Sequence, residues 1–178
     1  LELLKQKKIP EAYPEAEEGH QLGEESMEFR AQLLDCCGYC LIAYDWIRPL
    51  AEWIGKRRCL EIMCGSGALS SALQRCGIDI IATDDYSWEQ KHTVSWFRDT
   101  WTKVEQFSAV NAIRTYGEQI DFVLCSWPFL SEDCYDALQT MRKVNTDARM
   151  IFIGEWQGAT ASDAFFRAAQ VIPSESFQ

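Results

Sequence analysis

A glycine turn and an acidic residue at a fixed spacing are the first features of this chain that suggest chemistry. Gly65-Ser66-Gly67 follows the short apolar run 59–63, and Asp84 stands 17 residues after Gly67, where a second apolar run ends. Glycines between a strand and a helix let a ligand approach the backbone closely, and the helix begins with free N–H groups. A carboxylate at the next strand end accepts hydrogen bonds from ribose hydroxyls. The spacing therefore favours a nucleotide-type cofactor site over a turn that binds nothing and an aspartate that caps a loop.

A polar residue followed by proline and an aromatic side chain ends the apolar run 121–125. This loop is Ser126-Trp127-Pro128-Phe129, and Glu155 holds the corresponding place after the run 150–154. Ligands of open parallel sheets bind beyond the carboxyl ends of the strands, so we expect both to face the glycine turn. Two interpretations stay open for each. The loop is a substrate site or a rigid, proline-terminated strand end, and Glu155 is a ligand contact or a solvated carboxylate.

The elements that must position these residues alternate along the chain. Short apolar runs predict strands over 59–63, 78–83, around Val104, 120–125 and 149–154. Helical spacing predicts helices over 47–54, 68–76, 109–116, 131–144 and 162–169, with Gly77 and Gly117 as stop signals and Ser131 as an N-cap. Strands that alternate with helices and short loops indicate an α/β fold, a Rossmann-like parallel sheet with helices on both faces.

The N-terminal part of the chain has a different composition. Residues 11–25 contain six Glu and no Lys or Arg, so residues 1–25 are predicted to form a flexible acidic arm. Ser26 is the expected N-cap of a helix that carries Phe29, Leu33 and Cys37 at helical spacing. One domain therefore covers 26–178, divided into a helical cap at 26–56 and an α/β core at 57–178.

Bulk composition disfavours several classes of function. The formal net charge of −10 argues against a nucleic-acid partner, because such proteins present a basic face. No signal peptide and no apolar run of about 18 residues occurs, so we expect a cytoplasmic protein without a membrane partner. His20 and His92 are the only histidines, and Cys37-x-x-Cys40 has no second pair. Neither a metal site nor a histidine-dependent hydrolase is predicted, and nothing specifies the oligomeric state.

An aromatic-rich insertion follows the second predicted strand. It contains Trp88, Trp96, Phe97 and Trp101. Large aromatic side chains of this kind either pack into the core or cover a bound substrate as a lid, and both interpretations stay open.

Three of these segments together resemble the class I S-adenosylmethionine (SAM)-dependent methyltransferases. Residues 60–67 look like the glycine-rich first motif of that family, Asp84 matches its ribose carboxylate, and 121–129 is similar to its motif that runs polar–Pro–Pro–aromatic. The likeness covers roughly 40–170 and looks closest to a poorly characterised group with a Tyr-x-Trp-x-x-Pro element, here 44–49. It implies SAM as cofactor and methyl transfer to an unknown small-molecule or protein acceptor.

The resemblance also implies roles for individual residues. Gly65 and Gly67 would pass close to the methionyl part of SAM, Glu61 would orient its amino group, and Ser108 would lie near adenine. Ser126 would hold the acceptor in line with the sulfonium methyl. The full set of cofactor positions is Glu61, Met63, Gly65, Ser66, Gly67, Asp84, Asp85, Ser108 and Cys125. The catalytic set is Ser126, Trp127, Pro128 and Phe129.

The sequence departs from the family pattern in three places. Met63 stands where the family has glycine, Trp127 replaces the first proline, and Ser126 stands where Asn or Asp is commonest. The sheet of the family ends in an antiparallel hairpin, which we expect to be missing here. These departures support an alternative, a catalytically inactive methyltransferase-like binding or scaffolding module. A nicotinamide-dependent oxidoreductase is a weaker alternative. The fingerprint of that class is Gly-x-Gly-x-x-Gly/Ala, and this chain has Ser70 at the last position.

Overall fold

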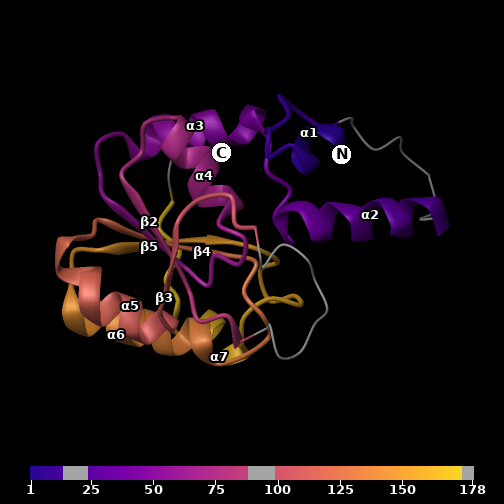
Figure 1. Cartoon of the computed structure of the whole chain (residues 1–178). Coiled ribbons are helices and arrows are strands. Elements are labelled where there is room, and N and C mark those ends of the chain that lie inside the picture. The colour runs from indigo at the N-terminus through magenta and orange to yellow at the C-terminus, as the bar shows by residue number, and fades with distance from the viewer. Residues whose placement is uncertain (14–23, 88–98, 174–178) are drawn as a thin grey trace.

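A computed structural model describes residues 1–13, 24–87 and 99–173 of the chain (Figure 1). Five strands form one sheet in the order β3-β2-β1-β4-β5, and every neighbouring pair is parallel. The strands are β1 (Cys59–Ile62), β2 (Ile80–Asp84), β3 (Val104–Gln106), β4 (Phe122–Ser126) and β5 (Arg149–Ile153). The predicted α/β, Rossmann-like parallel sheet is therefore confirmed.

The order of the strands creates a switch point between β1 and β4. From β1 the chain proceeds outward through β2 to β3, then returns to β4 on the other side of β1. The register pairs Cys59 with Ile80 on one side and with Phe122 on the other. At such a point the connections after the two strands leave in opposite directions, which opens a crevice beyond their carboxyl ends.

Helices cover both faces of the sheet (Figure 1). One face carries α3 (Tyr44–Ile54) and α4 (Ala68–Arg75), and the other carries α5 (Ala109–Tyr116), α6 (Asp133–Val144) and α7 (Asp163–Ala168). A short 3-10 turn, Gly117–Gln119, follows α5. Successive residues of a strand point to opposite faces, so Phe122 packs into the first core and Val123 into the second. Both cores are apolar and closely packed, and they fix the strand ends that carry the site.

The first 13 residues differ from the predicted flexible arm. The short helix α1 (Glu2–Lys5) places Leu4 in the core beside α3 and α4, and Ile9 is buried there as well. Arg48 of α3 forms an ion pair with Glu11. Apolar side chains at 4 and 9 therefore anchor this segment, while residues 14–23 lie outside the described residues.

Several helix ends also differ from the sequence prediction. α2 (Glu24–Cys37) begins before Ser26, so Ser26 lies inside the helix instead of capping it. α3 begins at Tyr44, which places Pro49 inside the helix and beyond its first turn. In the described part of the chain, no helix is both long enough and apolar enough to cross a bilayer.

Candidate functional site

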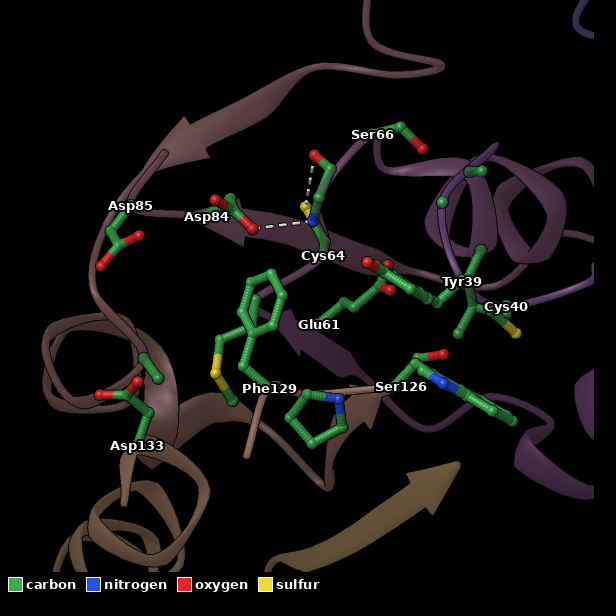
Figure 2. Close-up of a pocket in the computed structure, with 18 of the residues that line it drawn as sticks. Tyr39, Cys40, Glu61, Cys64, Ser66, Asp84, Asp85, Ser126, Phe129 and Asp133 are labelled. Atoms are coloured by element: carbon green, nitrogen blue, oxygen red, sulfur yellow. Dashed lines mark hydrogen bonds between the residues drawn. The ribbon is translucent and has the colours of Figure 1, made fainter. Parts of the chain in front are cut away.

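A cavity of about 230 Å³ lies at the carboxyl ends of the strands (Figure 2). Its walls are the loops that follow β1, β2, β3 and β4, together with the chain that follows α2. Among the predicted site residues, only Gly67 and Cys125 do not line it. The structure therefore brings four strand ends together at the switch point, where an open parallel sheet binds its ligands.

The glycine turn after β1 needs both of its glycines, for different reasons. Gly65 lines the cavity with φ 55°, a left-handed conformation that favours glycine. Gly67 is the N-cap of α4 with φ 71°, and a Cβ there would lie 3.0 Å from Cγ2 of Val104 and 3.1 Å from Cγ2 of Thr102. Gly67 thus permits close packing against the start of β3, whereas Gly65 brings backbone to the cavity.

Asp84 closes β2 and ties it to the glycine turn. Its carboxylate is buried, with 3% of the residue surface exposed. One oxygen, Oδ2, accepts a hydrogen bond from the Gly65 N–H at 2.7 Å, and Oδ1 accepts one from the Tyr86 N–H at 2.8 Å. These two bonds tie the glycine turn and the loop after β2 to one carboxylate that lines the cavity.

Glu61 is a buried carboxylate at the floor of the cavity. Its Oε2 accepts hydrogen bonds from the backbone N–H of Ser70 at 3.0 Å and from the Ser70 hydroxyl, near the start of α4. Burial raises the pKa of Glu61 to about 7, although the bonds from Ser70 oppose that shift. A carboxyl with a pKa of about 7 is partly ionised at neutral pH, and its charged form attracts a cation or an ammonium group.

Three residues with side chains adopt left-handed backbone at strand ends around the cavity. Met63 has φ 53° after β1, Tyr86 has φ 58° after β2, and Trp127 has φ 50° after β4. Such conformations cost about 1–3 kcal/mol for residues other than glycine and gather at functional sites. Met63 and Trp127 are two of the departures from the family pattern, and both line the cavity.

The loop after β4 forms the opposite wall. The N–H of Trp127 donates to the carbonyl of Ile153 at 2.6 Å, and Pro128 is buried. Phe129 is half exposed, and its ring meets that of Tyr39 edge to face at 6.4 Å. The loop is thus held rigidly on the β5 side and presents an aromatic ring at the rim of the cavity.

Ser126 ends β4 with its hydroxyl turned into the protein. The Oγ atom is buried and makes no hydrogen bond of good geometry with any described residue. The thiol of Cys40 lies beside it, and burial raises the pKa of that thiol to about 11 while Ser126 opposes the shift. Burial also raises the pKa of Cys64, on the cavity wall. These thiols are protonated at neutral pH, so neither supplies a thiolate nucleophile.

Other predicted residues have structural roles at or near the site. Ser108 lines the cavity as the N-cap of α5 and accepts a bond from the Asn111 N–H at 3.4 Å. Cys125 points away from the cavity, with its Sγ 3.6 Å from Sγ of Cys134 on α6. Strand side chains alternate between faces, so the predicted cofactor role of Cys125 has no basis in its side chain. Asp85 lines the cavity and accepts a bond from the Ser87 N–H.

Glu155 and Trp101, for which the sequence leaves two interpretations open, both lie outside the cavity wall. Glu155 does not line the cavity; its carboxylate accepts a bond from the Ala159 N–H at 2.9 Å and closes a local turn. Within the aromatic insertion, Trp101 is buried in the core cluster beside α2 and α4. Trp88, Trp96 and Phe97 lie outside the described residues.

The segment that follows α2 is the part of the site that the sequence prediction missed. Gly38, Tyr39, Cys40 and Ile42 line the cavity, and Asp133 at the start of α6 does so as well. No residue pattern in 38–42 indicates ligand binding, since its place depends on how α2 docks against the glycine turn. The one signal in this segment is Gly38, because a glycine often marks the end of a helix.

The charge of the cavity is one-sided. Among the described residues, its lining contains four carboxylates, namely Glu61, Asp84, Asp85 and Asp133, and no Lys, Arg or His. In the parts of the chain that the structure describes, no group of three or more His, Cys, Asp or Glu is arranged to hold a metal ion. The site therefore suits a neutral or cationic organic ligand better than a phosphate-rich one.

Comparisons with known proteins add no identification. No model of a protein family matches the chain, and no curated protein matches it. The functional assignment therefore depends on the residues and geometry of the cavity.

Proposed function

We propose that this protein binds SAM in the cavity at the switch point and transfers its methyl group to a small-molecule or protein acceptor. The observation that carries the proposal is the meeting of the glycine turn, Asp84 and the Ser126–Phe129 loop around one cavity. Each of these comes from a different strand end, and each has the chemistry expected for one part of SAM or for its acceptor.

The side chains that line the cavity offer the kinds of hydrogen-bonding and charged groups that SAM requires. Asp84 lines the cavity with a buried carboxylate at a strand end, a group that can accept hydrogen bonds from ribose hydroxyls. Glu61 offers a partly ionised carboxylate for the ammonium group. SAM carries a sulfonium and an ammonium against a single carboxylate, so it bears net positive charge. A cavity whose described lining has carboxylates and no basic side chain suits this ligand better than a dinucleotide with its pyrophosphate.

The chain supplies positioning rather than acid–base chemistry. SAM, when bound, supplies an activated methyl group, so no strong base is required to begin transfer. Ser126 lines the cavity, and its hydroxyl, which lies beside the Cys40 thiol, would rotate toward the cavity to hold an acceptor atom. Pro128 and the bond from Trp127 to Ile153 keep that loop fixed, while Phe129 and Tyr39 limit access of water.

The size of the cavity sets a condition on this proposal. Sites for cofactor-sized ligands usually measure about 300–1,000 Å³, whereas this cavity measures about 230 Å³. A cofactor-sized ligand would therefore extend through the open side of the cavity or displace part of a wall. The Met63 side chain and the segment after α2 are the two candidates, because neither belongs to the regular part of the sheet.

Calorimetric titration of the intact protein with SAM and S-adenosylhomocysteine tests the proposal, with NAD as the comparison ligand. We expect binding of both SAM compounds and none of NAD. The alternative function, a binding or scaffolding module without turnover, is favoured by Met63 and Trp127, whose side chains line the cavity at positions where the family has smaller residues. Binding of SAM without transfer of its labelled methyl group to any component of a cell extract would select that alternative.

A further inference from the structure

The C-terminal end of α2 is held on the glycine turn by side chains from two distant segments. The Ser66 hydroxyl donates to the carbonyl of Cys37 at 3.1 Å. The indole N–H of Trp101 donates to the carbonyl of Cys36 at 2.8 Å. The last carbonyls of a helix have no partner within the helix, so external donors decide where such an end is fixed.

The two donors are themselves joined. The backbone N–H of Trp101 donates to the carbonyl of Ser66 at 2.8 Å. Ser66 is 1% exposed and Trp101 is 8% exposed, so water does not compete for these bonds. The glycine turn, the segment before β3 and the end of α2 therefore form one hydrogen-bonded unit beside the cavity.

The chain held by this unit forms one wall of the cavity. Residues 37–42, here named the roof segment, supply Cys37, Gly38, Tyr39, Cys40 and Ile42 to its lining. They are not part of a helix or strand beyond Cys37. At the far end of the roof segment, the indole N–H of Trp46 donates to the carbonyl of Leu41 at 3.0 Å. Ser66 and Trp46 thus bond the two ends of the roof segment, and Trp101 bonds the residue just before it.

We infer that Trp101 and Ser66 are positioning residues that hold the roof segment closed over the ligand cavity and so control the rate at which a ligand enters. The identity of the ligand in this inference rests on the proposed function, whereas the position of the roof segment does not. The cavity is smaller than a cofactor usually requires. A roof segment held by a few side-chain hydrogen bonds can move away to admit a ligand, because each such bond contributes little net stability. Trp101 acts through the roof segment, since it does not line the cavity.

The experiment compares Trp101→Phe and Ser66→Ala with two matched controls. Trp53→Phe makes the same substitution at a tryptophan that stacks on Phe122, away from the cavity. Ser71→Ala does so at a second buried serine of α4 that does not line the cavity. The first measurement is amide hydrogen exchange of the unliganded protein, and the second is the association rate of S-adenosylhomocysteine.

We expect exchange in residues 37–42 to rise about three- to tenfold in Trp101→Phe and Ser66→Ala, the effect of losing one buried hydrogen bond. Exchange in β4 stays unchanged, and both controls behave as wild type. Association of S-adenosylhomocysteine should become faster by a similar factor, since the open form is more populated. If Trp101 and Ser66 had a purely structural role, the variants would be less stable, but S-adenosylhomocysteine would associate no faster.

Unchanged exchange of residues 37–42 in both variants would overturn the inference, and so would an increase spread evenly over the sheet. A wild-type protein that does not bind S-adenosylhomocysteine would contradict the proposed function alone, because the exchange measurement needs no ligand. Wild-type binding with association unchanged in both variants would contradict control of entry by these two residues.

Discussion

The carboxylate of Asp84 accepts a hydrogen bond from the backbone N–H of Gly65 at 2.7 Å, which joins the end of β2 to the turn after β1. This contact places a carboxylate and a glycine backbone at one point of the cavity wall, although 19 residues separate them along the chain. Asp84 consequently has two roles. It holds the turn in place, and it lines the cavity at the position proposed for a ribose.

Asp84→Asn should weaken SAM binding by about 1–3 kcal/mol, the usual cost of losing a hydrogen-bond partner in a buried site. Asparagine keeps one acceptor oxygen where the carboxylate has two, so it can accept from the N–H of Gly65 or of Tyr86 but not from both. Asp85→Asn is the matched control, because Asp85 also lines the cavity but its carboxylate accepts a bond from the Ser87 N–H on the exposed side. We expect an effect below about 0.5 kcal/mol there.

Calorimetry measures both affinities, and thermal unfolding checks that the variants remain folded. An Asp84→Asn protein with wild-type affinity would mean that the ribose does not lie at this strand end. Equal losses in the two variants would indicate a general effect of cavity charge instead.

Glu61 should make the protein less stable as the pH rises toward neutral. Burial raises its pKa to about 7 in the folded protein from the ordinary value of 4.5. Between these values the folded state binds more protons than the unfolded state, so the free energy of unfolding falls as pH increases. This pKa shift corresponds to about 3 kcal/mol in the free energy of unfolding. The contribution is complete below the pKa of the unfolded state and is lost above pH 7.

Urea unfolding of the wild type and of Glu61→Gln from pH 4 to pH 8 isolates this contribution. Glutamine preserves an oxygen that accepts the bonds from Ser70 but does not titrate. We expect the wild type to lose stability relative to Glu61→Gln as pH rises through this range. A difference that is constant with pH would show that Glu61 is not a buried titrating carboxyl.

Met63 should restrict the cavity and strain the backbone at the same time. Its φ of 53° is left-handed, and its side chain lines the cavity. Met63→Ala removes most of the side chain and keeps the strain, whereas Met63→Gly removes both. We expect both variants to bind SAM at least about threefold more tightly, which corresponds to roughly 0.7 kcal/mol. Met63→Gly should be more stable than Met63→Ala by about 1 kcal/mol.

Titration calorimetry and urea unfolding of these two variants separate space from strain. If both bind SAM no better than the wild type, the side chain does not limit the cavity. If Met63→Gly is the less stable variant, the left-handed backbone is not a source of strain.

Ser126→Ala should lower methyl transfer without altering SAM affinity. The hydroxyl is buried beside the Cys40 thiol, so its removal takes away one weak contact at that thiol and none at the residues proposed to bind SAM. A serine that holds an acceptor contributes to transfer alone. Transfer is followed with labelled SAM in a cell extract, and we expect a drop of about tenfold or more, the effect of one lost positioning bond. Weaker SAM binding by Ser126→Ala would instead place Ser126 in the cofactor half of the site.

Local patterns were sufficient to predict the sheet and most of the strand ends. The predicted helix 109–116 coincides with α5 because Ser108 caps it and Gly117 follows it. Gly65, Asp84 and Ser126 were found for a similar reason, since parallel strands bring their carboxyl ends to one edge. Short-range signals of this kind act within one element and need no knowledge of the rest of the fold.

Long-range contacts explain what the sequence did not predict. The place of Tyr39 over the cavity depends on bonds from Ser66 and Trp101 to the end of α2, across 29 and 65 residues of chain. Residues 1–13 were expected to be mobile on composition, yet Leu4 and Ile9 are buried. Cys125 and Glu155 have the right positions in the sequence, but their side chains are directed elsewhere. Side-chain direction follows from strand register and loop geometry, which composition does not reveal.

The measurement that tests the central claim most directly is calorimetric titration of the intact protein with SAM, repeated with Asp84→Asn. The account predicts binding by the wild type with a dissociation constant well below 1 mM, and an affinity about ten- to a hundredfold lower for Asp84→Asn, consistent with one lost buried contact. Absence of binding by the wild type at millimolar SAM would contradict it, because the cavity at the switch point would then not be a SAM site.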